Sequence, residues 1–380
     1  MKSKFTLQRH LGDMIRYIVP ASPATRRDKY YIWYIKFLSY VVGLKYLIFL
    51  FPIFIVAEPL KVVTINVWSG LDYIGSLKMG EYEPNEIREQ RYQLLIDQLK
   101  SLDPDVIALN EANKLPHYGR RIARDLGYDM VFHVGLGGLR MGPLGLPLNL
   151  REGDVILVKK HLQLKNEGRK QLSGGHVGNF FTCHFADATQ IIAASIIVNG
   201  KKIYIFNTHW HASKFADRKT LIPLTDQYLE GSLDGEEFLK TIDEAVKGKI
   251  WRLDEAGKTI DFIDKITGKN PVILMGDFND LSHSEPVGLL LNAGFIDTYP
   301  AVNDDPGYSW DEYLNSNIQK HYLKDQPNEE NTRRDRIDYI FSKGKSLKII
   351  RSEVVLNTIK KGLHPSDHFG VMTVFDIQAE

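Results

Sequence analysis

Short apolar runs separated by helical stretches dominate the chain from residue 60 onwards. Patterns typical of buried strands, rich in aliphatic and β-branched residues, occur at 61–68, 105–110, 154–159, 191–198, 202–207, 271–276, 337–342 and 371–376. Two segments, 85–101 and roughly 235–266, space their apolar residues as an amphipathic helix does. Strands that alternate with helices in this way predict a layered α/β fold.

Two segments interrupt this alternation. Residues 135–147, GLGGLRMGPLGLP, are rich in glycine and proline, so we expect a loop, although its apolar side chains are unusual for one. Such a loop either packs on its own domain or contacts lipid. Residues 303–332 are polar and irregular, which predicts a long surface excursion. Residues 214–245 look inserted only by comparison with the family that the motifs described below resemble.

An apolar stretch at residues 37–57, interrupted by Lys45, precedes the first strand. It is long enough for a helix that crosses a hydrocarbon core, which needs about 20 residues. Seven Lys or Arg residues lie before residue 30, so a single spanning helix would place the N-terminus in the cytoplasm and the catalytic region on the other side. The alternatives are a cleaved signal peptide followed by secretion, or a helix that lies in the membrane interface.

We therefore divide the chain into a basic N-terminal part, 1–58, and a catalytic domain, 60–380. Residues 1–45 hold nine Lys or Arg against two acids, a balance of +7; since the whole chain carries +1, the remainder carries −6. Proteins that grip nucleic acid usually have a basic binding surface, so this balance counts against a long nucleic-acid substrate. The single cysteine, Cys183, excludes an intrachain disulfide, and its strand-like setting indicates a core residue.

Polar side chains stand where several of these strands end or begin. They are acids, amides and imidazoles: Asn66, Glu111, His209, Asp277, Asn279, Asp338, Asp367 and His368. Any one of them has an ordinary explanation as a turn residue or a hydrogen-bonded surface group. Together they match the needs of phosphodiester hydrolysis: an oxygen-ligated divalent cation, a base or oriented carboxylate for the water, and donors to the phosphoryl oxygens.

The residue types also indicate which metal and which acid–base groups the site would use. Carboxylates without a cysteine partner, such as Glu111 and Asp277, suit Mg²⁺, or Mn²⁺, better than zinc. His209 and His368 can supply donors and the base, because imidazole titrates near neutral pH. A carboxylate beside a catalytic histidine fixes its tautomer, which is the role we expect for Asp338.

Six ordered blocks, TINVWSG, ALNEAN, NTHWHAS, LMGDFND, RIDYIF and PSDHFGV, span residues 61–377. They resemble the signature of the endonuclease/exonuclease/phosphatase superfamily, which includes deoxyribonuclease I-like nucleases, inositol polyphosphate phosphatases and neutral sphingomyelinases. The resemblance implies a four-layered α/β sandwich with two mixed β-sheets flanked by helices, here preceded by the N-terminal hydrophobic helix.

The same resemblance implies roles by motif position. Glu111 would be a metal ligand, with Asn66 helping at the metal and Asp367 beside it. Asp277 and Asn279 would hold the phosphate, the nucleophilic water or a metal.

The two imidazoles take complementary roles in this pattern. His209 would bind the phosphate, with a second role as an acid. His368 would activate the water or polarise the phosphate, oriented by Asp338.

The block NTHWHAS, followed by KIWRLDEAGKTIDFI and GDFND, is similar to the neutral sphingomyelinase branch. It predicts a membrane-associated, metal-dependent phospholipase C of EC 3.1 that acts on a phospholipid and contacts the membrane through residues 37–57, with no obligate protein partner. The enzyme alternatives are a deoxyribonuclease-like endonuclease, which would need a basic groove near Asn66 and His368, and a phosphoinositide phosphatase. The non-enzyme alternative is an inactive binding module of the same fold, which the complete set of acids, amides and imidazoles argues against.

Other polar residues receive no catalytic role. The unassigned histidines are His176, His184, His211 and His364. The basic run Arg333, Arg334 and Arg336 is most simply a solvated loop next to a strand, with phosphate binding as the alternative.

Overall fold

The structure, a computed structural model, describes residues 58–75, 77–141, 144–173, 189–323, 327–329 and 332–378. The apolar segment 37–57 lies outside these ranges, as do Cys183, His176 and His184. Within the described ranges, no helix has the length and apolar character needed to cross a bilayer. The membrane anchor therefore stays a prediction from the sequence.

The first of two large sheets is mixed. Its strands run in the order β13 (Leu347–Val355), β14 (Gly370–Ile377), β1 (Leu60–Asn66), β2 (Val106–Ala112), β4 (Leu144–Lys159) and β3 (Tyr128–Met141). β1 and β2 are parallel, and the other neighbours are antiparallel. The strands predicted at 61–68, 105–110, 154–159 and 371–376 all belong to this sheet.

The second sheet has the same mixed character. Its order is β5 (Lys165–Gln171), β6 (Gln190–Val198), β7 (Lys201–His209), β8 (Val272–Asp277), β12 (Asp338–Lys343) and β9 (Ile296–Asp297). Here β7 and β8 are the parallel pair. A separate two-stranded ribbon joins β10 (Trp310–Asp311) to β11 (Arg334–Asp335).

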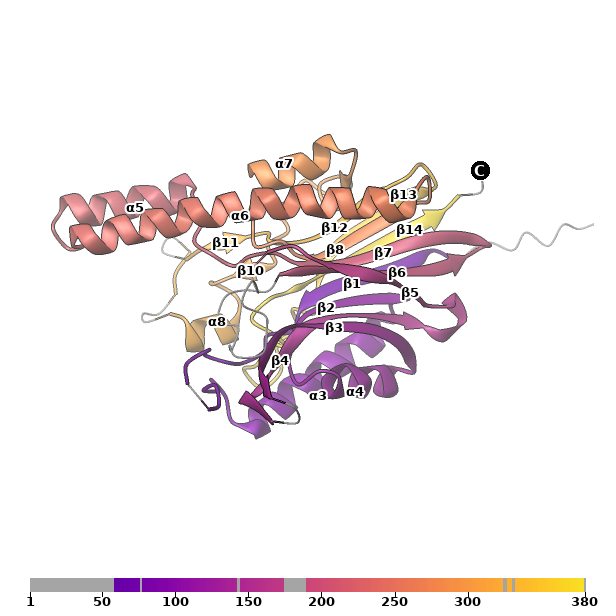
Figure 1. Cartoon of the computed structure of the whole chain (residues 1–380), viewed down its shortest axis with the longest axis horizontal. Helices are drawn as coiled ribbons and strands as arrows, with labels where there is room; N and C mark the ends of the chain where they lie inside the picture. The colour runs from indigo at the N-terminus through magenta and orange to yellow at the C-terminus, as the bar shows by residue number, and fades with distance from the viewer. Residues whose placement is uncertain are drawn as a thin grey trace, which may run out of the picture. The chain divides into compact units, whose positions relative to one another are not determined.

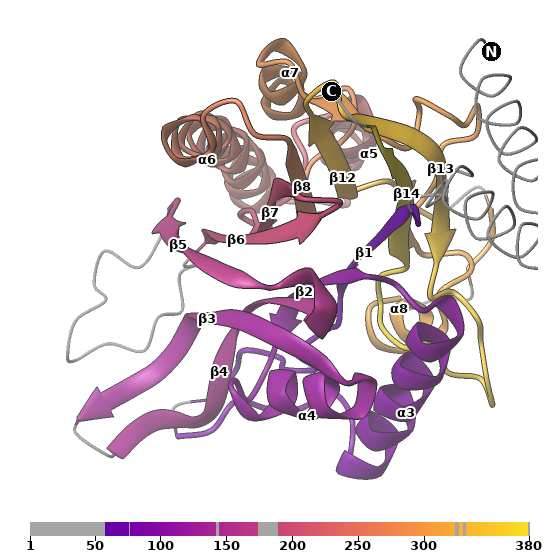
Figure 2. The ribbon, with the colours of Figure 1, turned by 90° about the vertical axis from the view of Figure 1, so that its right-hand side faces the viewer.

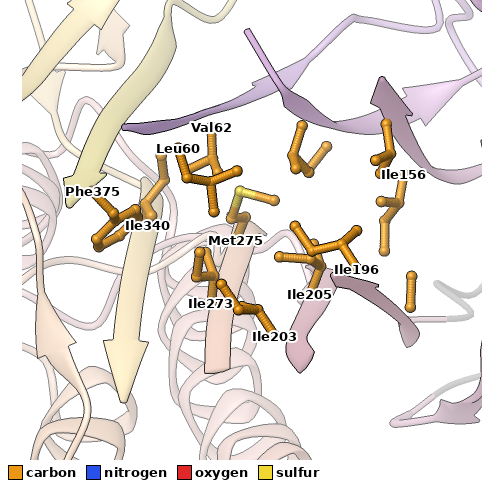
Figure 3. Packing of buried hydrophobic residues seen from close by; sticks show 14 of the residues in the cluster. Leu60, Val62, Ile156, Ile196, Ile203, Ile205, Ile273, Met275, Ile340 and Phe375 are labelled. Atoms are coloured by element: carbon orange, nitrogen blue, oxygen red, sulfur yellow. The ribbon is translucent and has the colours of Figure 1, made fainter. Parts of the chain in front are cut away.

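Helices cover the outer face of each sheet (Figures 1 and 2). α3 (Asn85–Leu102) and α4 (His117–Leu126) pack on the first sheet through one apolar cluster, and α6 (Gly235–Thr267) and α7 (Glu285–Asn292) pack on the second through another. A third cluster, which includes Val62, Ile205 and Ile273, fills the space between the sheets (Figure 3). Three apolar layers between four layers of backbone confirm the predicted fold class.

The remaining helices are peripheral. The described ranges also contain α5 (Arg218–Leu229), α8 (Ser316–His321) and a 3₁₀ turn, Lys160–Leu162. α5 buries no residue completely. It and the first part of α6 form a helical hairpin from the segment that looked inserted, and this hairpin extends beyond the sheets (Figure 1).

Two sequence predictions about loops were wrong. Residues 135–147 are largely strand, because β3 and β4 pair with each other along this length and satisfy their backbone groups, with register shifts where Gly135 and Gly138 fall. Residues 303–332 are no simple surface excursion, since β10 and α8 lie there and Ser309 and Asn315 are fully buried. In both cases tertiary pairing overrides a local composition that favours loops.

Strand pairing brings the predicted polar residues to one edge of the two sheets. His209 lies opposite Asp277 in the parallel pair β7–β8, and Asp338 lies opposite Asp277 where the antiparallel strand β12 begins. In the first sheet, β1 and β2 are parallel, so Asn66 and Glu111 also end at a common edge. Asp367 and His368 directly precede β14, which runs antiparallel to β1 and starts at that edge.

Gly276, the residue before Asp277, has no room for a side chain. Its φ is +140°, and an added Cβ would lie 1.9 Å from the Thr208 carbonyl oxygen on β7. Gly276→Ala should therefore lower the free energy of unfolding by about 3 kcal/mol or more, because strain and overpacking add. Urea unfolding measures this, with Gly200→Ala as the control, since Gly200 has φ +78° but open space around it and should cost about 1 kcal/mol. An equal loss of unfolding free energy in the two variants would show that β7 and β8 can move apart to accommodate the added methyl group.

Candidate active site

The centre of the site is an amide that joins carboxylates from both sheets. Asn66 Nδ2 lies 2.9 Å from Glu111 Oε1 and 3.1 Å from Asp277 Oδ2, and Asn66 itself is buried. Glu111 Oε2 also accepts a hydrogen bond of 3.2 Å from the Ser69 backbone N–H. The end of β1 thus fixes the position of both acids, one from each sheet.

Glu111 is held in an uncommon backbone conformation. Its φ is +53°, and the pairing of β2 with β4 shifts register between Leu109 and Ala112, around Glu111. A bulge of this kind redirects one side chain out of the regular alternation, and positive φ in a residue other than glycine costs on the order of 1–3 kcal/mol. Such strain is commonly found at functional sites.

Asp338 and His368 form a hydrogen-bonded pair beside this centre. The distance between His368 Nδ1 and Asp338 Oδ2 is 2.8 Å, and both residues are buried. His368 Nε2 lies 3.9 Å from Asp277 Oδ2. Burial alone would lower the pKa of His368, but the Asp338 and Asp277 carboxylates outweigh it and raise the pKa well above its usual value.

His209 approaches Asp277 from the other side. Its Nε2 lies 3.6 Å from Asp277 Oδ2. Burial lowers the pKa of His209, but Asp277 and Glu111 more than offset this, and the pKa is raised to about 9. Both imidazoles are therefore cationic at neutral pH in this arrangement, which makes them donors to an anion.

Sequence reasoning missed two acids of the site, Glu152 and Asp154. Glu152 Oε2 accepts from the Tyr73 hydroxyl at 2.5 Å, and Asp154 Oδ1 accepts from Asn110 Nδ2 at 2.7 Å. Burial raises the pKa of Glu152 to about 8 and that of Asp154 to about 6. The available signal was the run REGDVIL, in which two acids share one face of a strand whose following residues are all apolar.

The negative charge gathered here fits a divalent cation. Burial together with the like-charged Asp338 raises the pKa of Asp277 to about 6 against the opposing His368. Burial together with Glu111 raises the pKa of Asp367 to about 6, again against His368. A hard cation would relieve this repulsion, and the available ligands are carboxylate oxygens without a thiolate, which suits Mg²⁺ or Mn²⁺. Glu111 and Asp367 would hold it, and Asn66 would help by positioning Glu111, since its Nδ2 donates to Glu111 and its Oδ1 accepts from the Trp68 backbone N–H at 3.0 Å.

Within the described ranges, the three-residue group of acids or imidazoles whose potential ligand atoms lie close together is a different one. Atoms of Asp277, Asp338 and His368 all lie within 4.8 Å of one another. Since His368 Nδ1 is already engaged with Asp338, this group is better explained as an oriented imidazole than as a complete metal site.

Asn279 and Asp367 complete the predicted set. Asn279 has φ +47°, its backbone N–H donates to Asp277 Oδ1 at 2.9 Å, and its Nδ2 donates to the Trp210 carbonyl at 3.0 Å. Asp367 accepts from the Ser366 hydroxyl at 3.1 Å and from the Tyr322 hydroxyl at 3.3 Å. The structure thus brings all eight predicted residues to one site, and their individual roles stay predictions.

Helix α6 fixes the loop that follows His209. Arg252 is buried, and its guanidinium donates to Asp280 Oδ2 at 2.9 Å and to the His211 carbonyl at 3.2 Å. Glu255 accepts from the His211 backbone N–H at 2.9 Å and from the hydroxyls of Ser173 and Thr189. The block WRLDEAG, noted for its resemblance, is therefore a structural support of the site.

Residues left outside the site have structural explanations. The His211 ring packs on Trp251 at 4.2 Å, and His364 Nδ1 binds the backbone and hydroxyl of Ser316. The interpretation of the arginine run as a solvated loop was wrong, because these side chains sit among acids. Arg333, Arg334 and Arg336 pair with Asp335, Asp311 and Asp297, respectively.

Comparison with known proteins supports this architecture. Residues 249–368 match the Endonuclease/Exonuclease/phosphatase family, and this segment contains Asp277, Asn279, Asp338 and His368. A comparison with the sequences of curated proteins gave no significant match.

Several solved structures share the fold, each covered over 84% of this chain. One is D. rerio TDP2 complexed with a single-strand DNA product, with 17% identity, a TM-score of 0.52 and 99% of that chain covered. Another is the human Nocturnin catalytic domain with bound sulfate, with 16% identity, a TM-score of 0.51 and 95% covered. A third, an endonuclease/exonuclease/phosphatase family protein from Leptotrichia buccalis C-1013-b, has 18% identity, a TM-score of 0.50 and 100% covered. The predicted superfamily resemblance is confirmed, and the sphingomyelinase branch stays a prediction.

The pH dependence of stability tests whether Glu255 on α6 is buried beside the loop that follows His209. Burial raises its pKa, so the folded protein retains this proton to a higher pH than the unfolded chain, and Glu255 costs stability as pH rises through the folded pKa. Glu255→Gln, which has no charge, should lose less free energy of unfolding than the wild type between pH 5 and pH 8 in urea titrations. The exposed Glu230→Gln is the control and should follow the wild type. Identical pH profiles for all three proteins would contradict a buried Glu255 carboxylate.

Proposed function

We propose that this chain, which has the endonuclease/exonuclease/phosphatase fold, is a metal-dependent phosphodiester hydrolase that acts on a membrane phospholipid in the manner of a sphingomyelinase-like phospholipase C. One observation carries the hydrolase class: Asp277 Oδ2 lies 3.6 Å from His209 Nε2 and 3.9 Å from His368 Nε2, and it also contacts Asn66, which binds Glu111. An anionic phosphodiester and a water fit such a site electrostatically.

Each residue has a physical task in this proposal. Protonated His209 and His368 donate to the phosphoryl oxygens, and Asp338 keeps His368 oriented. Asp277, whose pKa of about 6 makes it a competent base near neutral pH, orients the attacking water and accepts its proton. As the new P–O bond forms and the ester P–O bond breaks, His209 gives its proton to the leaving alkoxide oxygen. Mg²⁺ held by Glu111 and Asp367, next to Asn66, would supply charge neutralisation at the phosphate.

Three features of the sequence favour a phospholipid substrate. The apolar segment 37–57 ends only three residues before β1, so an anchored domain would stay next to the bilayer, on its non-cytoplasmic side if the segment spans. The balance of −6 outside residues 1–45 weakens the grip on a polyanion. The block NTHWHAS adds the resemblance to neutral sphingomyelinases.

A nuclease is the second candidate. Its support is the shared fold with D. rerio TDP2, which was solved with a single-strand DNA product. The two candidates make different demands on the surface around the same catalytic residues, so substrate profiling separates them.

A substrate panel tests both candidates. The full chain in detergent should release phosphocholine from sphingomyelin with Mg²⁺ and lose this activity with a chelator, while double-stranded DNA stays intact. Glu111→Gln should abolish the metal-dependent rate and keep the fold, whereas the exposed Glu230→Gln should behave as the wild type. DNA nicking with inert lipids would reject the phospholipase proposal, and full activity of Glu111→Gln would reject Glu111 as a ligand.

Removing the imidazole of His368 tests the catalytic pair. His368→Ala should lower kcat by about 10²–10⁴ while binding of substrate stays measurable, because an acid–base or charge-stabilising group acts mainly in the transition state. The control is His161→Ala, which removes an exposed imidazole from the 3₁₀ turn. A decrease of less than tenfold would remove His368 from the catalytic machinery.

A further inference from the structure

A cleft of about 450 Å³ opens beside the catalytic pair. Asn279 and His368 of the candidate active site are part of its lining. Its sides come from the segment after β7, at Ala212 and Phe215, and from the β10–β11 ribbon, at Trp310. The site and the cleft are continuous, so a group that occupies the cleft can be part of the molecule whose phosphate is hydrolysed.

The walls of this cleft are mostly apolar. Phe215, Trp310 and Ile337 contribute ring and aliphatic surface, and the Trp310 ring meets the His368 ring edge-on with centroids 5.1 Å apart. Polar and charged residues also line the cleft, but its accessible surface is mainly apolar. A volume in the range of ligand pockets with a mainly apolar surface is typical of a site for an apolar moiety.

Several polar groups that line the cleft are already engaged. Asn279 Nδ2 donates to the Trp210 carbonyl, and Trp310 Nε1 lies 3.4 Å from Glu312 Oε1. The Arg333 guanidinium is bound to Asp335, to Asp217 at 3.2 Å and to the Thr220 hydroxyl at 2.7 Å. A nucleobase placed here would have to displace these contacts to pair with the same groups, which is costly.

The positive charges in the lining of the cleft disfavour a choline head group as its occupant. Aromatic rings near an acid can bind a quaternary ammonium group, but Arg333 already lies over the Phe215 ring at 4.5 Å and neutralises Asp335. Lys214 adds a second cation to the lining. A choline head group would meet repulsion on this side, whereas an alkyl chain would not.

We propose that this cleft binds the alkyl chain next to the scissile phosphate, and that Phe215 and Trp310 determine the preference for an apolar substituent. The inference rests on the proposed phosphodiester hydrolase, and it assigns the lipid portion of the substrate to the His368 side of the site. Phe215 directly precedes the α5–α6 hairpin, so the inserted segment supplies one wall of the cleft.

Binding of ethyl-, butyl- and hexylphosphonate with Mg²⁺ tests the inference without turnover, because their carbon–phosphorus bond resists hydrolysis. Calorimetry on the full chain in lipid nanodiscs should show affinity that rises about threefold to fourfold per methylene, as apolar burial predicts. Phe215→Ser should flatten this dependence, and Phe215→Leu should restore most of it. The matched control is Phe238→Ser, which removes a half-buried ring that stacks on Tyr228 in the helical hairpin.

Each outcome decides the inference. Affinity that is independent of chain length in the wild type, or equal loss of the dependence in Phe215→Ser and Phe238→Ser, would overturn it. Tighter binding of adenosine monophosphate than of hexylphosphonate, lost in Phe215→Ser, would overturn it in favour of a nucleobase. Chain-length dependence without hydrolysis of any substrate in the panel would support the cleft and reject the proposed hydrolase, so the two failures are distinguishable.

Discussion

The side-chain amide of Asn66 is the contact on which the site depends, because it is shared by acids that belong to different sheets. Glu111 lies near the end of a strand of one sheet and Asp277 ends a strand of the other, and the Asn66 amide nitrogen lies 2.9 Å from the first acid and 3.1 Å from the second. The Ser366 hydroxyl in turn donates to the Asn66 backbone carbonyl at 2.6 Å, which ties the segment containing Asp367 to the same strand. Packing of the two sheets and assembly of the site are therefore one event.

This assembly concentrates negative charge in a buried place, and the fold must compensate for it. Burial raises the pKa of Asp277, Glu152 and Asp154, which means that the folded chain tolerates these acids more easily when they are protonated. The imidazoles of His209 and His368 provide partial compensation, and a divalent cation would provide the rest. Buried acids and imidazoles destabilise a protein core. In this site the same acids can bind a cation, and the same imidazoles can bind an anionic substrate.

Much of the fold and the site could be predicted from the sequence, because an apolar run followed by a polar residue is visible in a short stretch of sequence. Each of the eight predicted strands is present in the structure. Asn66, Glu111 and His209 were recognised by their positions at or after the ends of such strands. Other features depend on pairing and burial that local composition does not show. The β3–β4 hairpin pairing overrides a composition that favours a loop, and Glu152 gains its importance only from burial beside Glu111. The arginine run pairs with the adjacent Asp335 and also with Asp217, Asp297 and Asp311, which lie in other segments.

Arg91, a basic residue near the site, positions a neighbouring segment of the chain and does not face a polyanionic ligand. Arg91 is buried, donates to Glu83 at 2.6 Å and to the Pro365 carbonyl at 3.0 Å, and lies over the Trp68 ring at 4.5 Å. Its guanidinium is therefore paired inside the protein, and through Pro365 it holds the segment that leads to His368. Because these contacts occupy its guanidinium, Arg91 is not available to meet the successive phosphates of a long nucleic acid.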